Sequence, residues 1–442
     1  MDIIVAGAGT VGYSLAQVLS FQHNVIVIDK DRRKLDRLDE DIDIMVIQGD
    51  VEDPKTYGSL LYDRVDLFIA VTDSDEANLL ATLVVEDVVT VGRKIVRLKN
   101  DGFLTSHVLD KLQIDHAVFP DITTANKVKA LLTFPKANNV KVFHQTRMKL
   151  ISIRVQSLEE QDGVTVKSVC NEAVWVVGIE RQKRFWLPEP DMVIEENDLV
   201  YFFGEAEHIE MIAQRLEKKM PAKIQNVVIF GANTQAQKIA KALLEKKLEI
   251  KMIEKGRTLC EEATTFLEGR VQVIQAAYED HRLFEEEGVK YADMVIAAGK
   301  SDEKNIVKCV EAKEYGIEKV VAINNDRSYY ALMHKMGVVV VRGSKAGAHY
   351  AILEKISSST VVTQRLFCGG MALFVMRKVY PDSPLIGKPL KQSKKIAMVC
   401  ALIRQDALYD LSEVRMIEEG DIIVASGKIE DKDEIERWIY TL

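Results

Sequence analysis

MDIIVAGAGTVG, residues 1–12, is a short apolar run that breaks into a glycine-rich turn. The apolar run at residues 3–6 predicts a buried parallel strand. Val11, Leu15 and Leu19 follow at the spacing of one helix face, so a helix is expected directly after the turn. The spacing G-x-G-x-x-G between a strand and a helix is the setting that a dinucleotide-binding fingerprint requires. The opening of the chain therefore predicts a Rossmann-like α/β domain.

Each glycine of this turn has a separate physical role. Gly7 permits the tight turn, Gly9 lets the backbone approach a pyrophosphate, and Gly12 allows the helix to lie close to the strand. The start of the helix offers unpaired N–H groups and the positive end of its dipole to phosphate. We therefore expect a phosphate site at this turn.

A second apolar run at residues 24–28 ends on Asp29. This carboxylate follows the glycines by about twenty residues, where a ribose-binding acid is expected. Lys30 comes next and is included in the candidate site. A doubly wound domain whose nucleotide site has been lost is the alternative.

Strand and helix patterns alternate through residue 133, which predicts a parallel, doubly wound sheet buried on both faces. Ligands of such sheets bind at the carboxyl ends of the strands, which here supply Asp50, Thr72 and Asp73. Arg97 and Lys99 are two residues apart on a strand, so they point to the same side. They are candidates for binding terminal phosphates, and solvent-facing edge charges are the alternative.

The chain then repeats itself. Residues 226–236 repeat the opening turn, residues 250–254 repeat 25–29, and residues 419–427 resemble 196–204. We divide the chain into a Rossmann-like domain N1 (1–140), a small α+β module C1 (141–220), a second Rossmann-like domain N2 (221–358) and a second α+β module C2 (359–442).

The two N domains differ at the predicted site. In N2, Gly9, Gly12, Asp29 and Asp50 are replaced by Asn233, Ala236, Glu254 and Ala277, and Ile323 or Asn324 lies near the cationic positions. An asparagine in place of Gly9 puts a side chain where the pyrophosphate approaches the backbone. We therefore predict that N1 binds nucleotide, whereas N2 binds poorly, binds something else or is a scaffold.

Composition narrows the function classes. The 442 residues are 47% hydrophobic and 29% charged with a net charge of −8, so nucleic acid is not an expected partner. No apolar stretch approaches the roughly 18 residues of a membrane span. The five cysteines form no C-x-x-C pair, so reduced core cysteines are expected and no metal site is predicted.

Motifs of common catalytic sites are missing from the sequence. It contains no H-E-x-x-H, G-x-S-x-G or C-x-x-C pattern. A binding and regulatory protein is therefore favoured over an enzyme. An NAD-dependent oxidoreductase and a nucleotide-sensing regulator of another partner are the alternatives.

The motifs also carry a resemblance. Residues 1–12, the Gln48-Gly49-Asp50 turn and residues 71–78 (VTDSDEAN) resemble RCK (regulator of K+ conductance) domains, and residues 383–388 (SPLIGK) are similar to the opening of their C-terminal module. The N–C–N–C order resembles the regulatory subunits of Trk-type potassium uptake systems.

The resemblance implies binding of NAD(H) and of ATP or ADP in N1. It assigns Asp29 to the ribose and Asp50 to the adenine, and it assigns a terminal phosphate to Arg97 with Lys99 as a second basic residue. Val71 and Thr72 would line the cleft. The phosphates would be held by Gly7, Ala8, Gly9, Thr10 and Val11.

The resemblance also implies partners. It describes a cytoplasmic, non-enzymatic protein that forms a ring of RCK domains, as a homotetramer, at the inner face of the cell membrane. The ring would bind a membrane potassium-translocating subunit of the TrkH/TrkG type and gate it in response to nucleotide.

Overall fold

The computed structural model describes all residues except 59, 61–62, 135–136, 144, 156–162, 217–223, 279, 327, 357–360, 391–396 and 412. It comprises two compact units. Unit 1 contains residues 1–123 and 342–356, and unit 2 contains residues 124–341 and 357–442. The expected domain boundaries at 220/221 and 358/359 lie outside the described residues.

Unit 1 is built on a six-stranded sheet with the order β3-β2-β1-β5-β7-β8, in which all neighbouring strands are parallel. The predicted doubly wound parallel sheet is therefore confirmed. The central strands are buried because their residues are almost all apolar, as a sheet covered on both faces requires. The strands are β1 (Asp2–Ala6), β2 (Asn24–Asp29), β3 (Met45–Gln48), β5 (Leu67–Ala70), β7 (Lys94–Arg97) and β8 (His116–Val118).

Helices cover the sheet between successive strands. They are α1 (Thr10–Leu19), α2 (Arg32–Asp41), α3 (Pro54–Tyr57), α4 (Asp75–Val88) and α5 (Val108–Lys111), with a 3-10 turn η1 (Asp101–Thr105). A separate two-stranded pair joins β4 (Arg64–Val65) to β6 (Thr90–Val91). Helix α3 ends at Tyr57, and the N–H of the following Gly58 donates to the carbonyl of Lys55.

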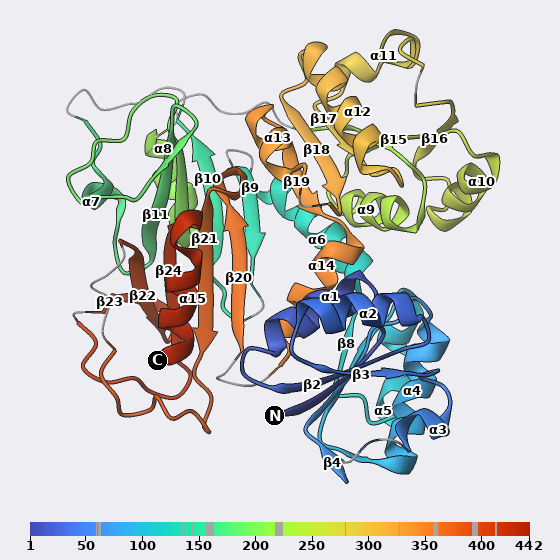
Figure 1. The fold of residues 1–442 in the computed structure, drawn as a ribbon. Coiled ribbons are helices and arrows are strands. Elements are labelled where there is room, and N and C mark those ends of the chain that lie inside the picture. Colours follow the sequence, from blue (N-terminus) through green and yellow to red (C-terminus); the bar gives the residue numbers. More distant parts are fainter. Residues whose placement is uncertain are drawn as a thin grey trace. The chain divides into compact units, whose positions relative to one another are not determined.

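Unit 1 also contains a helix from the second half of the sequence. Helix α14 (Ser344–Leu353) contacts α1 and β8, and Figure 1 shows it in orange alongside the blue α1. Ala348 and Ile352 are fully buried, so this contact excludes water. The duplication alone would assign these residues to N2, whereas their apolar side chains are buried in unit 1.

Unit 2 contains the second Rossmann-like sheet, with the order β16-β15-β14-β17-β18-β19. Its strands are β14 (Asn226–Phe230), β15 (Glu249–Glu254), β16 (Gln272–Gln275), β17 (Met294–Ala297), β18 (Lys319–Asn324) and β19 (Val339–Arg342). Its helices are α9 (Thr234–Leu244), α10 (Arg257–Phe266), α11 (Leu283–Glu286), α12 (Asp302–Glu314) and α13 (Tyr330–Lys335), with a 3-10 turn η2 (Val289–Tyr291). The strand order repeats that of unit 1, as the duplication predicts.

Helix α6 (Pro120–Thr133) leads into the first α+β module, whose sheet order is β12-β11-β13-β10-β9. The second module has the matching order β23-β22-β24-β21-β20. The first contains β9 (Ala137–Val142), β10 (Lys149–Arg154), α7 (Val166–Val169), β11 (Val174–Arg181), β12 (Arg184–Trp186), β13 (Leu199–Gly204) and α8 (Ala206–Leu216). The second contains β20 (Val362–Phe367), η3 (Cys368–Gly370), β21 (Ala372–Lys378), β22 (Val399–Arg404), β23 (Ala407–Asp410), β24 (Ile422–Lys428), η4 (Ile429–Asp431) and α15 (Lys432–Thr441).

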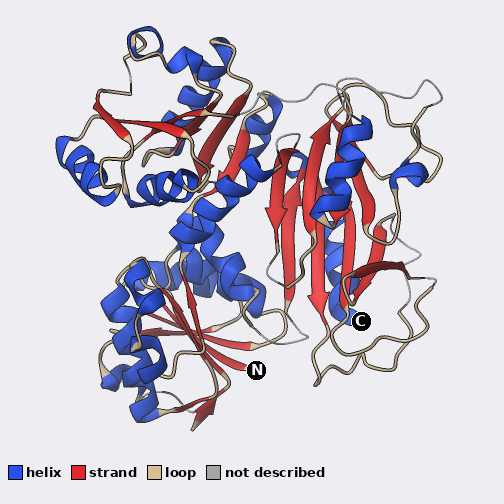
Figure 2. Cartoon of the chain, turned by 180° about the vertical axis from the view of Figure 1, so that it is seen from behind, coloured by secondary structure: helices blue, strands red, loops and turns tan. Residues whose placement is uncertain are grey.

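One bidentate ion pair recurs in both modules and supports their equivalence. Arg181 binds Asp198 through Nε at 2.9 Å and Nη2 at 2.7 Å. Arg404 binds Asp421 in the same way, with both distances at 2.8 Å. The two sheets share a core that includes Phe203 and Phe374, whose ring centroids lie 4.8 Å apart. Figure 2 shows the red strands of the two modules side by side.

No helix among the described residues is long and apolar enough to cross a membrane.

Candidate nucleotide site

The glycine turn after β1 has the geometry that its sequence predicts. Gly7 has a φ of 112°, and a Cβ there would lie 3.0 Å from the backbone nitrogen of Thr72. A Cβ on Gly12 would lie 1.8 Å from the carbonyl oxygen of Gly7, so α1 can approach β1 only with glycine at this position. A Cβ on Gly9 would meet nothing within 4 Å. The space above Gly9 is therefore open to a ligand.

Asp29 connects the end of β2 to the glycine turn. Its Oδ2 accepts a hydrogen bond from the backbone N–H of Ala8 at 2.7 Å, and its Oδ1 accepts one from Asp31 at 2.8 Å. Lys34 Nζ lies 3.7 Å from Oδ2. The carboxylate is therefore fixed at the rim of the turn, where a ribose hydroxyl could donate to it.

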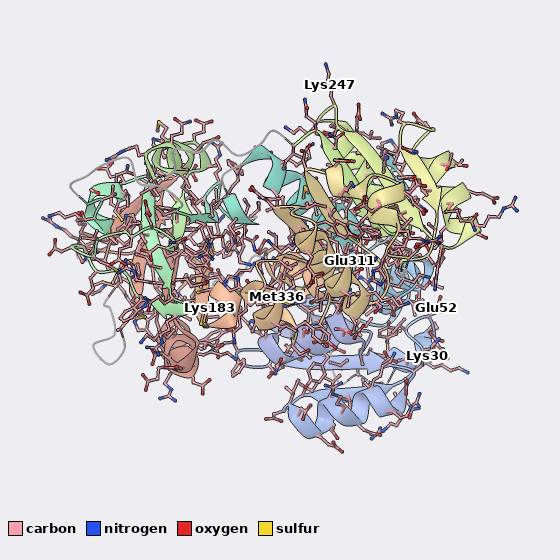
Figure 3. All side chains as sticks on the ribbon, turned by 90° about the horizontal axis from the view of Figure 1, so that it is seen from above. Lys30, Glu52, Lys183, Lys247, Glu311 and Met336 are labelled. Atoms are coloured by element: carbon pink, nitrogen blue, oxygen red, sulfur yellow. The ribbon has the colours of Figure 1, made fainter. Side chains whose placement is uncertain are left out.

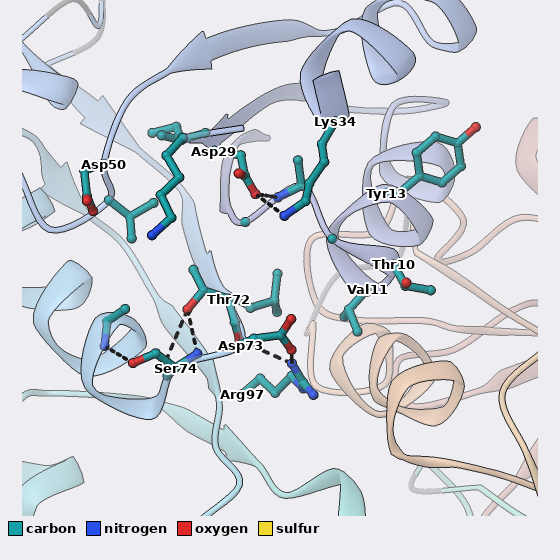
Figure 4. A pocket seen from close by; sticks show the side chains of 18 of the residues that line it. Thr10, Val11, Tyr13, Asp29, Lys34, Asp50, Thr72, Asp73, Ser74 and Arg97 are labelled. Carbon is teal, nitrogen blue, oxygen red and sulfur yellow. Dashed lines mark hydrogen bonds and ion pairs between the residues drawn. The ribbon is translucent and has the colours of Figure 1, made fainter. Parts of the chain in front are cut away.

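A cavity of about 770 Å³ opens at the carboxyl ends of the unit 1 strands. This volume lies in the range of small-molecule sites. Figure 4 shows the Asp29–Lys34 and Asp73–Arg97 pairs on facing sides of it. Of the fourteen predicted site residues, twelve line the cavity: Gly7, Ala8, Gly9, Thr10, Val11, Asp29, Lys30, Asp50, Val71, Thr72, Asp73 and Arg97.

Two predicted residues do not line the cavity. Gly12 contacts the Gly7 carbonyl, and the absence of a side chain there allows α1 to pack against β1. Lys99 Nζ donates to the carbonyl of Asp73, and the Lys99 backbone N–H donates to Asp75 Oδ1 at 2.8 Å. Lys99 therefore holds the turn that carries Asp73 and does not face the ligand space.

Arg97 is the buried cation of the site. Its residue is 5% exposed, and Nη1 donates to the carbonyl of Thr72 and to Asp73 Oδ1, both at 3.2 Å. Its Nε has no hydrogen-bond partner among the described residues. Burial alone would raise the pKa of Asp73, but the hydrogen bond and charge of Arg97 lower it, with weaker help from Lys99 and Lys345.

Asn78 supports Arg97 from behind and was not singled out from the sequence. Its Oδ1 accepts from the Thr72 backbone N–H at 2.8 Å, and its Nδ2 donates to the carbonyl of Arg97 at 2.8 Å. Asn78 is 1% exposed and lies near the start of α4. Its two hydrogen bonds connect the ends of β5 and β7. Asn78 is the last residue of the VTDSDEAN motif at residues 71–78, so that motif could have identified it as a site residue.

Basic residues of α2 also face the cavity. Lys34 and Arg37 line it together with Tyr13, and the Arg37 guanidinium lies 4.9 Å from the centroid of the Tyr13 ring. Lys34 and Arg37 were not among the predicted site residues, although their spacing of three places them on one face of α2. Glu52 is a further lining residue, and Figure 3 shows it on the same side of unit 1 as the predicted Lys30. The other missed lining residues are Ser14, Ile28, Gly49, Val51, Ser74 and Ala77.

A further cation comes from the other half of the sequence. Lys345, in the first turn of α14, lines the same cavity and contributes to lowering the pKa of Asp73. No local pattern could identify it, because only the position of α14 in unit 1 brings it to the site. The cavity therefore has two cations near Asp73, of which one is contributed by the duplicated half.

The corresponding region of N2 is closed by its own side chains. Asn233 Oδ1 caps α9 by accepting from the Ala236 N–H at 3.1 Å, and its Nδ2 donates to the carbonyl of Ala298 at 2.7 Å. Tyr278, which corresponds to Val51, lies against Gly231: a Cβ on that glycine would come within 2.8 Å of the phenol oxygen. The helix end and turn that serve as a phosphate site in N1 are therefore occupied in N2.

N2 also lacks the two basic residues that lie at the carboxyl end of β7 in N1. Asn305 repeats the role of Asn78, since its Nδ2 donates to the carbonyl of Ile323 at 2.9 Å. This equivalence places Ile323 at the position of Arg97. Asp302 accepts from the backbone N–H of Asn325 at 3.0 Å, as Asp75 does from Lys99, so Asn325 replaces Lys99. Thus N2 keeps the frame of the site and a carboxylate at Glu254, but not the basic residues at the positions of Arg97 and Lys99.

Comparison with solved structures identifies the fold. The chain is similar to the crystal structure of the GsuK RCK domain, with a TM-score of 0.59 and 15% identity over 100% of this chain and 95% of that one. The GsuK channel bound to NAD gives a TM-score of 0.59 and 15% identity, covering 100% of this chain and 79% of that one. GsuK bound to ADP gives a TM-score of 0.51 and 14% identity, covering 81% and 70%. These similarities show that the fold is that of RCK domains.

Similar proteins match the chain over almost its full length. A "Trk system potassium uptake protein TrkA homolog" of Archaeoglobus fulgidus is 28% identical over 99% of both chains. The "Trk system potassium uptake protein TrkA" of Halomonas elongata is 27% identical over 96% of this chain and 95% of its own. The TrkA-C domain family matches residues 150–217, and the TrkA-N domain family matches residues 3–120 and again 227–342. The chain therefore belongs to the TrkA-N domain family and contains that domain twice.

Proposed function

We propose that the protein is a nucleotide-binding regulatory subunit of a Trk-type potassium uptake system, with its working site in N1. The open cleft of unit 1 is the observation that carries this proposal. It combines a bare helix N-terminus at the glycine turn, a fixed carboxylate at Asp29 and a buried guanidinium at Arg97. These groups match the pyrophosphate, the ribose and a terminal phosphate of an adenine nucleotide.

We assign NAD(H) and ATP or ADP as the ligands. The backbone from Gly7 to Val11 binds phosphate, Asp29 accepts from the ribose, and Asp50 lies toward the adenine. The names of GsuK structures solved with NAD and with ADP support these two ligand classes for the fold. Arg97 and Lys345 meet the terminal phosphate of ATP. That phosphate competes with Asp73 for Arg97, because both are anions.

Regulation follows from the course of the chain. Helix α14 carries Lys345 and contacts α1, whereas the residues on both sides of 342–356 belong to unit 2. A γ-phosphate that attracts Lys345 therefore acts on a helix whose two ends continue into the other unit. Nucleotides change the protein only through their different affinities for two conformations, and a coupling of about 1–3 kcal/mol per site is typical.

We assign the output to a membrane potassium-translocating subunit of the TrkH/TrkG type. The names of the relatives from Archaeoglobus and Halomonas support a place in potassium uptake. In this proposal the protein is cytoplasmic and forms a homotetrameric ring of RCK domains at the inner face of the membrane. Binding of ATP, ADP or NAD(H) in N1 changes the ring and gates the partner.

Calorimetric titration of the full chain with ATP, ADP, NAD+ and NADH tests the site. We expect binding with different affinities for ATP and ADP, and a loss of at least about tenfold in Asp29→Asn. Glu254→Gln is the matched control, because Glu254 is the equivalent carboxylate of N2. Its Oε2 accepts from the Ala232 N–H at 3.3 Å, as Asp29 accepts from the Ala8 N–H at 2.7 Å. Absence of binding by all four nucleotides, or loss in the Glu254 variant alone, would contradict the assignment to N1.

Gating has a separate test. The purified protein is added to vesicles that contain the membrane subunit, and rubidium uptake is recorded with each nucleotide. We expect uptake to differ between ATP and ADP for the parent protein and to lose this difference in Asp29→Asn. Equal uptake with both nucleotides would contradict nucleotide gating, even where calorimetry shows binding.

A further inference from the structure

Three segments of unit 2 bring a carboxylate, an imidazole and a thiol together. Glu180 lies on β11, His334 on α13 and Cys368 in η3, and their potential ligand atoms all lie within 4.8 Å of one another. His334 Nε2 is 2.5 Å from Glu180 Oε2, and Cys368 Sγ is 3.5 Å from the same oxygen. Glu180 Oε2 is therefore the common point of the cluster.

The cluster is shielded from solvent. Glu180 is 6% exposed and Cys368 is 1% exposed, and the His334 side chain is 14% exposed. Arg154 Nη2 lies 3.8 Å from Glu180 Oε1, so the second carboxylate oxygen faces a cation and Oε2 faces the other two groups. Buried ionisable groups are costly unless they are paired or bind a metal.

The backbone around the cluster fixes two of its members. Cys368 has a φ of 51°, an uncommon conformation for a residue with a side chain. A Cβ on the next residue, Gly369, would lie 2.7 Å from His334 Cδ2, so this glycine lets the turn lie against the imidazole ring. The turn therefore holds the thiol and the imidazole on the same side of Glu180.

A small cavity adjoins the imidazole. It measures about 10 Å³ and is lined by His334, Tyr201, Ser152 and Tyr330, among others. Ser152 is 2% exposed and its Oγ has no hydrogen-bond partner among the described residues. This volume corresponds to about one water molecule. A water there could bond to Ser152 and also reach a metal ion in the cluster.

Comparison with another histidine–glutamate pair of unit 2 separates this cluster from an ordinary ion pair. His281 Nδ1 lies 2.6 Å from Glu311 Oε1, but the His281 side chain is 78% exposed. The other oxygen of Glu311 binds the Lys308 ammonium at 2.6 Å. At Glu180 the third group at the shared oxygen is a thiol, which is a metal ligand and not a counter-charge.

The types of ligand atom indicate which metal ions fit. Imidazole nitrogen, thiolate sulfur and a carboxylate oxygen are all ligands of Zn²⁺, which commonly takes three protein ligands and a water. Sulfur and nitrogen ligands do not suit K+, Mg²⁺ or Ca²⁺, which prefer oxygen. The ligand atoms of the cluster thus fit a borderline transition metal better than K+, Mg²⁺ or Ca²⁺.

We propose that Glu180 Oε2, His334 Nε2 and Cys368 Sγ bind a divalent transition metal ion of the Zn²⁺ class, with a water in the adjoining cavity as the fourth ligand. Binding displaces the thiol proton of Cys368 and the proton between His334 and Glu180, and both leave to solvent. The two atoms now 2.5 Å apart separate to about 3.3–3.7 Å, as tetrahedral ligands with bonds near 2.0–2.3 Å require.

The consequence is a cross-link within unit 2. β11 belongs to the first α+β module, α13 to the second Rossmann-like sheet and Cys368 to the second module. One ion would thus connect three substructures that meet only through tertiary contacts. The nucleotide cleft of N1 contributes no ligand, so the metal site does not depend on the proposed function.

Cobalt titration of the full chain, after treatment with a chelator and in the presence of a reductant, tests the proposal. We expect one Co²⁺ per chain, intense visible bands of a tetrahedral complex and a thiolate-to-cobalt charge-transfer band. Added Zn²⁺ should displace the cobalt and raise the melting temperature. Cys368→Ser should abolish the charge-transfer band and weaken binding at least about 100-fold.

Matched variants make each outcome decisive. Cys400→Ser alters another buried cysteine of the same module, and His281→Gln alters the other pair; both should keep the band. If Cys368→Ser fails to fold, Glu180→Gln retains the shape of the side chain and should weaken binding by a similar factor. Failure to bind Co²⁺, a band that survives Cys368→Ser, or unchanged affinity in a folded Glu180→Gln would overturn the site. Asp29→Asn should keep full metal binding.

Discussion

The clefts of N1 and N2 share a frame but differ in what lines it. Both sheets have the same strand order, and Asn78 and Asn305 make the same bonds between adjacent strand ends. In N1 the cleft is open and charged, whereas in N2 Asn233 and Tyr278 fill the equivalent space.

This difference separates the residues that a Rossmann-like sheet needs to fold from those that it needs to bind. The asparagine and the first glycine of the turn occur in both copies, because they satisfy buried backbone groups and permit a positive φ. The later glycines and Arg97 occur only in N1. The second copy instead contributes α14 and Lys345 to unit 1.

The largest effect should come from giving N1 the asparagine of N2. Gly9→Asn places a side chain over the turn without a clash in the ligand-free protein, because a Cβ there meets nothing within 4 Å. We expect nucleotide affinity to fall at least about 100-fold with an unchanged melting temperature, since the amide competes for the phosphate donors. The reciprocal Asn233→Gly is the control and should leave calorimetric binding unchanged. Retained affinity in Gly9→Asn would mean that phosphates bind elsewhere.

A smaller effect is expected at the buried guanidinium. Arg97→Ile introduces the residue of N2, and we expect ATP affinity to fall about tenfold and ADP affinity to fall less, because ATP carries the additional phosphate. The ratio of the two dissociation constants is the measurement. Arg97→Lys keeps the charge but loses the bidentate geometry of the guanidinium. Its ratio of dissociation constants should therefore lie between those of the parent protein and of Arg97→Ile. A ratio equal to that of the parent protein would remove Arg97 from the terminal-phosphate site.

Lys345 should contribute less, because it is solvent-exposed. We expect Lys345→Ala to weaken ATP binding about threefold at low salt and to have a smaller effect at high salt, as screening of an exposed charge requires. Lys335→Ala, which alters a lysine of α13, serves as the control and should show no such change. If salt leaves the effect of Lys345→Ala unaltered, its contribution is not a charge–charge interaction.

The smallest effect concerns the two lysines that begin β7 and β18. Lys94 Nζ lies 2.9 Å from Glu86 Oε1, but Lys319 Nζ donates to the carbonyl of Ala137 at 2.6 Å, and burial lowers the pKa of Lys319 to about 8. The unfolded chain therefore binds a proton between pH 8 and about 10.5 that the folded chain has released, so stability rises with pH in this window.

Lys319→Met should remove this dependence. At pH 7 we expect the variant to be more stable than the parent by about 1 kcal/mol, because the half-buried ammonium no longer has to be desolvated. The gain should shrink as the pH rises from 8 to 10.5. Melting temperatures of parent and variant across this range are the measurement. Lys94→Met should instead destabilise the protein at pH 7, and a pH-independent difference for Lys319→Met would contradict the assigned cause.

Much of unit 1 could be predicted from local sequence. The β1 turn and Asp29 have a fixed spacing that neighbouring strands impose, and the apolar runs have the period of buried strands. Lys99 does not line the cavity, and its ammonium donates to the carbonyl of Asp73.

The fold class, the duplication and the glycine–carboxylate part of the site could be predicted from the chain alone, because they depend on periodicity and spacing. Long-range packing places α14 in unit 1, Lys345 at the cleft, Tyr278 in the counterpart of the cleft in N2, and Glu180 beside His334 and Cys368. The last three residues are separated by up to 188 positions, so no local pattern relates them. Contacts over such distances arise from the packing of whole substructures and leave no signal in a single sequence.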